Sequence, residues 1–276
     1  MSTSARLVLT CVLLLPSSAR ASAQPAAGVR ETAAPLVVEI ARADYEGDRP
    51  KLQRLREDLA PLTAKAGDAR TASRLRYWQG FALWRRAFNG FNVSAPPADL
   101  SSDLEGAIRD FEAALRDDPG FVDAKVGIIS CMQSLAALSR DNPQRIQELV
   151  PRFMQLFKES LAAAPGNPRL LWVYGAQQWY NASQLGKGRR EDAIATYAKG
   201  LDLARAQKGS ATDPLEPAWG EPELLMSLAW TSLNGPQPDA RAAKEHARQA
   251  LGLVPHWRYL RDILMPQIDA TLGKPK

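Results

Sequence analysis

The stretch Ala107-Ile-Arg-Asp-Phe111-Glu-Ala-Ala114-Leu-Arg-Asp-Asp-Pro119 decides the fold class of this chain. The small residues Ala107 and Ala114 allow a neighbouring helix to approach closely, Phe111 fills the space between them, and Pro119 ends the helix. Such a helix cannot bury its apolar face alone, and we expect it to be the second helix of a hairpin that stacks on similar hairpins.

The composition agrees with an all-α globular protein. The chain has 276 residues, of which 45% are hydrophobic and 24% are charged, which is ample for a core. Apolar residues seldom alternate, so strand signals are weak. The net charge of +5 is spread along predicted helices without a basic cluster, which argues against a nucleic-acid partner.

Residues 1–23 are typical of a cleaved export signal. Arg6 precedes the apolar run 7–15, and Ala21-Ser-Ala23 offers small residues to a signal peptidase. The run is shorter than the roughly 20 residues that span a bilayer. We therefore expect a periplasmic or secreted protein without an integral membrane span after cleavage. Residues 24–34 are predicted to be a flexible tether, and residues 35–272 to be the helical domain.

Cleavage would remove Cys11 and leave Cys131 as the last cysteine of the exported chain. A lone cysteine forms no intramolecular disulfide, so packing must hold the domain together. Cys131 lies on an apolar helix face and is interpreted as a small buried hydrophobic residue.

Further segments repeat the small–aromatic–small spacing or a variant of it. Residues 172–180 and 192–200 form a predicted hairpin, residues 223–230 pair with residues 240–251, and residues 257–264 form a last helix. Two long connections, residues 89–100 and residues 208–222, interrupt the series.

These segments resemble tetratricopeptide repeats, whose period is about 34 residues. The resemblance is strongest at 107–119; Phe153 and Arg205 depart from the family pattern. It implies a right-handed α-α superhelix of about five hairpins with a C-terminal closing helix. In that family the first helix of each hairpin lines a concave surface, and Gly80 and Gly175 stand where those helices carry a small residue.

The resemblance places a set of aromatic and arginine side chains on the concave surface, and such residue types carry much of the binding energy of interfaces. The alternative is that these aromatic residues pack between helices. The candidate partner-binding residues are Arg74, Tyr77, Phe81, Trp84, Arg85, Arg169, Trp172, Trp179 and Tyr180.

No catalytic or metal-binding motif is evident. His246 and His256 lack nearby acids, nucleophiles or further histidines at a useful spacing. We therefore predict an exported, non-enzymatic scaffold, without cofactor or metal, that binds a protein or peptide in its groove. The alternatives are an enzyme or small-molecule-binding protein in a closed helical array, which buried carboxylates with shifted pKa values would indicate, or a membrane-attached assembly factor.

Overall fold

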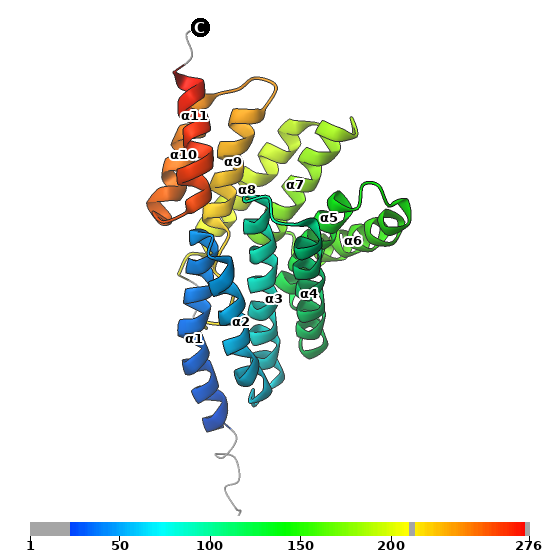
Figure 1. Cartoon of the computed structure of the whole chain (residues 1–276), viewed down its shortest axis with the longest axis vertical. Helices are drawn as coiled ribbons and strands as arrows, with labels where there is room; N and C mark the ends of the chain where they lie inside the picture. Colours follow the sequence, from blue (N-terminus) through cyan, green and yellow to red (C-terminus); the bar gives the residue numbers. More distant parts are fainter. Residues whose placement is uncertain (1–22, 210–212, 274–276) are drawn as a thin grey trace, which may run out of the picture.

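The computed structural model describes residues 23–209 and 213–273 of the chain. Within these ranges the regular structure is entirely helical, with eleven α-helices, one π-helical turn and no strand (Figure 1). The predicted all-α class is therefore confirmed for the described residues.

The helices follow one another with short connections, apart from the segment before α9. They are α1 (Ala23–Glu46), α2 (Arg49–Ala64), α3 (Ala69–Phe91), α4 (Pro97–Asp117), α5 (Val122–Leu138), α6 (Pro143–Ala163), α7 (Pro168–Gln184), α8 (Arg190–Gln207), α9 (Glu221–Asn234), α10 (Ala240–Leu253) and α11 (Met265–Leu272). Several begin at an Asp or Asn whose side chain accepts a hydrogen bond from a first-turn amide, because the first amides of a helix lack partners within it.

Each helix packs against the next, and a second set of contacts joins helices two apart. These contacts link α1 to α3, α3 to α5, α5 to α7, and α7 to α9. The odd-numbered helices therefore form a continuous layer, which we call the inner layer. The C-terminal helices return to the carboxyl end of α1 (Figure 1), where the rings of Tyr45 and Trp257 lie 5.0 Å apart.

The packing around Phe111 explains the spacing that decided the fold class. Ala107, Phe111 and Ala114 are fully buried. The ring of Phe111 lies so close to α5 that a Cβ atom on Gly127 would come within 2.4 Å of its Cε2 atom. A glycine is therefore required for the helices to approach this closely.

The predicted tether is wrong. Residues 24–34 lie within α1, where Val29 and Ala33 are buried and Arg30 pairs with Asp213 at 2.6 Å. The prediction began the helical domain at Pro35, because proline is common in the first turn of a helix. The apolar spacing of α1 in fact continues upstream of this exposed proline. The predicted export signal, residues 1–23, lies outside the described residues except for Ala23.

Two other boundaries also differ from the prediction. The loop expected at residues 89–100 is reduced to residues 92–96, because α3 runs to Phe91 and α4 begins at Pro97. The closing helix passes Pro266 and ends at Leu272. Proline has no amide hydrogen and so cannot donate the usual backbone bond of an α-helix. The turn before it, Leu260–Leu264, is π-helical, and the Met265 amide donates to the Leu260 carbonyl oxygen.

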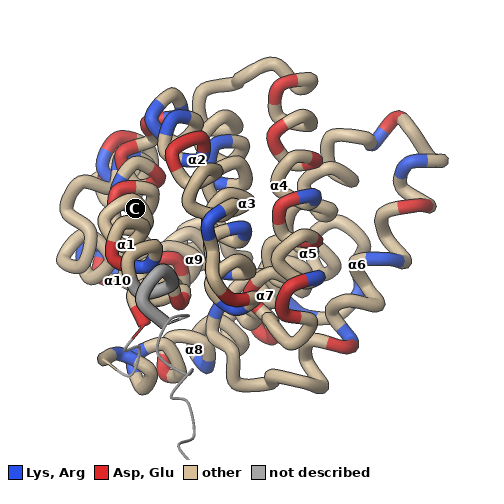
Figure 2. Tube along the Cα trace, turned by 90° about the horizontal axis from the view of Figure 1, so that it is seen from below, with Lys and Arg blue, Asp and Glu red and all other residues tan. Residues whose placement is uncertain are grey.

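Acidic and basic residues are interspersed along the helices (Figure 2). Many form ion pairs between neighbouring helices, such as Arg56 with Asp110 at 2.9 Å and Arg76 with Asp117 at 2.7 Å. Among the described residues, no helix has the length and apolar character that crossing a membrane requires.

Candidate functional site

The segment before α9 packs onto the inner layer, and we call its residues 213–220 the strap. Trp219 is 8% exposed, and its ring lies 5.6 to 5.7 Å from those of Phe81, Trp84 and Trp172. Its indole nitrogen donates a hydrogen bond to the hydroxyl oxygen of Tyr77 at 2.8 Å. The strap therefore places an aromatic side chain where α3 and α7 face each other.

Polar contacts fix the rest of the strap. The indole nitrogen of Trp78 donates to the carbonyl oxygen of Leu215 at 2.8 Å, and Glu216 accepts from Arg74 at 2.9 Å. Arg169 Nη1 donates to the carbonyl oxygen of Trp219 at 3.2 Å. Groups of the strap thus occupy Arg74 and Arg169, two donors of the inner layer that the sequence assigned to a partner.

Five of the predicted partner-binding residues are therefore not available for a partner in this structure. Tyr77, Phe81 and Trp84 are at most 1% exposed, so they belong to the core, as the packing alternative proposed. Arg74 pairs with Asp118 and with the strap, and Arg169 pairs with Asp123. The sequence did not indicate this burial and pairing, because the strap and the acidic residues lie far from these positions along the chain.

The open part of the inner layer is a cleft around Trp172, which we call the Trp172 cleft. It consists of two adjoining cavities, of about 360 Å³ and about 430 Å³, that share Phe88, Ser134, Trp172 and Ala176 as walls. Their size and largely apolar lining are typical of small-molecule sites.

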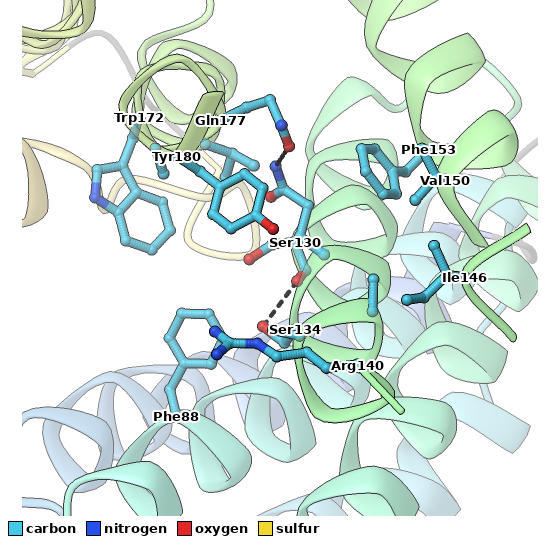
Figure 3. A pocket seen from close by; sticks show the side chains of 15 residues that line it. Phe88, Ser130, Ser134, Arg140, Ile146, Val150, Phe153, Trp172, Gln177 and Tyr180 are labelled. Atoms are coloured by element: carbon cyan, nitrogen blue, oxygen red, sulfur yellow. Dashed lines mark hydrogen bonds between the residues drawn. The ribbon is translucent and has the colours of Figure 1, made fainter. Parts of the chain in front are cut away.

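The smaller cavity lies between α5, α6 and α7 (Figure 3). Phe153 approaches from α6 and Tyr180 from α7. Among its polar groups, Gln133 Nε2 donates to Gln177 Oε1 at 2.6 Å and Ser134 donates to the carbonyl oxygen of Ser130 at 3.0 Å, and Arg140 also lines the cavity. Because the rest of the lining is largely apolar, this cavity is suited to an apolar group.

The larger cavity has an aromatic wall and a charged end. The aromatic lining comes from α3, α7, α8, α9 and the segment that leads to α11. It consists of Phe88, Phe91, Trp172, Trp179, Tyr197, Trp230, Trp257 and Tyr259. The indole nitrogen of Trp172 donates to the Ser227 hydroxyl at 2.9 Å, so this ring offers mainly apolar surface to the cavity.

The charged end of the larger cavity is a buried cluster that joins α1, α3 and α9. Arg85 Nε donates to Asp44 Oδ2 at 2.7 Å, and Asn89 Nδ2 donates to Asp44 Oδ1 at 3.0 Å. Arg85 Nη2 lies 3.7 Å from Glu223 Oε1, which accepts from the hydroxyl of Tyr45 at 2.8 Å. We call Arg85, Asp44 and Glu223 the Arg85 cluster.

Two groups of this cluster, Asp44 and Arg85, have shifted pKa values. Loss of solvation raises the pKa of Asp44 to about 6, although the guanidinium of Arg85 acts in the opposite direction. Burial alone would lower the pKa of Arg85, but Asp44 and Glu223 raise it above its usual value, so the guanidinium stays charged. Buried carboxylates with shifted pKa values that line a cavity are common at functional sites.

Four predicted residues do line the Trp172 cleft, namely Arg85, Trp172, Trp179 and Tyr180. The sequence analysis did not select Phe88, although it lies four residues after Trp84 and one turn further along α3. Nor did it select Asp44, which carries no local signal because its charged partner Arg85 is 41 residues away.

Groups with reactive side chains elsewhere are isolated. Cys131 is fully buried, as predicted, and burial raises the pKa of its thiol well above the usual value. His246 is half-buried rather than solvated, and burial lowers its pKa. Across residues 23–209 and 213–273, no three His, Cys, Asp or Glu side chains are grouped as a metal site would require.

No protein-family model matches the chain, and no curated protein or solved structure matches it significantly.

Proposed function

We propose that this chain is an exported, non-enzymatic binding protein whose Trp172 cleft takes a small, largely apolar ligand. The cleft carries this proposal, since two adjoining cavities share aromatic walls and one of them ends at the Arg85 cluster. A mostly apolar lining with few polar groups binds the body of a ligand and fixes its orientation. Asp44, a buried carboxylate with a raised pKa that lines the larger cavity, is a feature of the kind expected of this class of function.

We also propose that the hairpins form a right-handed superhelix like that of tetratricopeptide repeats. The contacts between successive odd-numbered helices support this arrangement, because stacked hairpins bring their first helices together. Export is proposed on the strength of residues 1–23. Mass spectrometry of the N-terminus of the native protein tests it, and a chain that retains residues 1–23 would favour membrane attachment instead.

Binding of the neutral fluorescent probe N-phenyl-1-naphthylamine tests the ligand site. We expect saturable binding to the folded protein and at least tenfold weaker binding to the Ala176→Trp variant, because the new indole fills space shared by both cavities. Val38→Trp is the matched control, since Val38 is 64% exposed on α1, away from the cleft. Equal binding by both variants would refute the ligand site, and so would absence of saturable binding by this probe and by the two naphthalene probes described below.

A second candidate function is capture of a protein or peptide partner, which the strap favours. The inner layer holds this non-helical segment through an inserted tryptophan and through bonds to two of its carbonyl oxygens. A labelled peptide of residues 213–220 should bind in trans to the Trp219→Ala variant and not to the wild type, whose own strap competes. Fluorescence anisotropy measures this, and no binding to the variant would remove the support that the strap gives.

A further inference from the structure

The guanidinium of Arg85 lines the larger cavity with most of its hydrogen-bonding capacity unused. Among the described residues, its hydrogen bond is the one from Nε to Asp44. Nη1 is buried without a partner, and Nη2 is 3.7 Å from Glu223 Oε1, which is an ion-pair distance rather than a hydrogen bond. An unpaired buried donor is energetically costly. Because Arg85 is only 5% exposed, its unpaired nitrogen points to an acceptor on a ligand.

The charges around Arg85 determine which acceptor fits. Asp44 and Glu223 flank the guanidinium, and their side chains are 4% and 1% exposed. Their two negative charges exceed the single positive charge of Arg85. A ligand carboxylate would lie close to both in a poorly solvated site, where like charges repel strongly. A carbonyl oxygen accepts the same hydrogen bonds without this repulsion.

The aromatic side chains that line the larger cavity determine which kind of ring system the ligand carries. The Arg85 Cζ atom lies 5.7 Å from the ring centroid of Phe88 and 5.9 Å from that of Trp172. Both rings line the cavity, and Trp230 lines it from α9. An aromatic ring bound among these walls would therefore place a short substituent next to the guanidinium, and it would be attracted to the wall rings at centroid separations of about 4.5–7 Å.

We propose that the larger cavity binds a neutral aromatic compound whose carbonyl oxygen accepts hydrogen bonds from the Nη atoms of Arg85. This rests on the proposed function and specifies the class of ligand. The selection is by charge, because an anionic compound of the same shape meets the carboxylates of the Arg85 cluster.

A matched pair of probes tests the proposal with the mature wild-type protein. Calorimetric titration at pH 7.5 compares 1-naphthaleneacetamide with 1-naphthaleneacetate, which share the ring and differ in the charge of the substituent. We expect the amide to bind at least tenfold more tightly. Trp230→Ala should weaken both probes by a similar factor, because it removes a wall and leaves the charges unchanged.

Substitutions of single arginine residues test whether Arg85 is the residue that selects the neutral probe over the anionic one. Arg85→Lys should reduce the preference for the amide to less than threefold, because lysine loses the two Nη donors and keeps the charge. Arg76→Lys is the control on the same helix, since Arg76 pairs with Asp117 outside the cleft, and it should keep the full preference. The wild-type comparison decides the matter if Arg85→Lys does not fold.

The outcomes separate the two proposals. Equal affinities, or tighter binding of the acetate, would overturn the selection by Arg85 and leave the cleft as a binding site. So would saturable binding of N-phenyl-1-naphthylamine without binding of the amide. If none of the three probes binds, the proposed function itself is refuted.

Discussion

Replacement of Trp219 by alanine should strongly destabilise the protein, because this side chain fastens the strap to the inner layer. The ring is 8% exposed and contacts aromatic residues of α3 and α7, and its indole nitrogen donates to Tyr77 at 2.8 Å. The substitution removes both contacts and leaves the hydroxyl of Tyr77 without this donor.

The structure gives the magnitude of the effect. Loss of a buried tryptophan side chain costs about 3–5 kcal/mol when its surroundings cannot collapse into the space, and the lost hydrogen bond contributes about 1 kcal/mol. Because the strap can relax partly toward α3, we expect Trp219→Ala to lower the free energy of unfolding by about 4 kcal/mol. Trp219→Phe keeps a buried ring and should cost about 1–2 kcal/mol.

Urea unfolding followed by far-ultraviolet circular dichroism measures these differences without relying on tryptophan fluorescence. Tyr180→Ala is the control, since Tyr180 is 44% exposed on α7, and it should change stability by less than about 1 kcal/mol. A loss below about 1 kcal/mol for Trp219→Ala, with native helicity, would show that the strap does not seat its tryptophan in solution.

Three further predictions concern titration, packing and reactivity. Asp44 has a pKa of about 6 when folded against an ordinary value of 3.8, so the folded state holds its proton more tightly and its contribution to stability falls as the pH rises from about 4 to about 7. Urea unfolding at both pH values should therefore show Asp44→Asn gaining about 2 kcal/mol on the wild type over this interval, and a constant difference would contradict the buried environment. Gly127→Ala should cost about 1–3 kcal/mol, because its Cβ atom would come 2.4 Å from Phe111, whereas Gly252→Ala, which faces open space in α10, should stabilise the protein by up to about 1 kcal/mol in thermal unfolding. The thiol of Cys131 should react with a disulfide reagent in urea and not in the native protein, because burial raises its pKa; rapid labelling of the native protein, located by peptide mass, would count against the packing of α5.

The helices and their pairing could be predicted because their signals are local. The spacing of Ala107, Phe111 and Ala114 lies within three turns of one helix, and its burial follows from the period of the helix. The tether was mistaken for a similar reason, since Pro35 is a local signal for a helix start. The buried residues upstream of it continue the apolar face of α1.

The site was predicted in part. Trp172 and Arg85 were selected from their residue types and their helices, and both line the cleft. The partners of Arg85 were not foreseen, because Glu223 follows it by more than a hundred residues. The burial of Trp219 was not foreseen either, because this residue lies in a connection rich in proline and glycine.

The amino-acid sequence by itself determined that this protein is a series of helical hairpins, since the period of its apolar residues and its helix-ending prolines act over a few residues. Tertiary structure alone decided which aromatic residues are core and which line a cleft. That choice depends on the strap, which covers Tyr77 and Trp84, and on the Arg85 cluster, which joins α1, α3 and α9. Burial and charge balance are properties of groups brought together in space, and the local pattern of a sequence does not contain them.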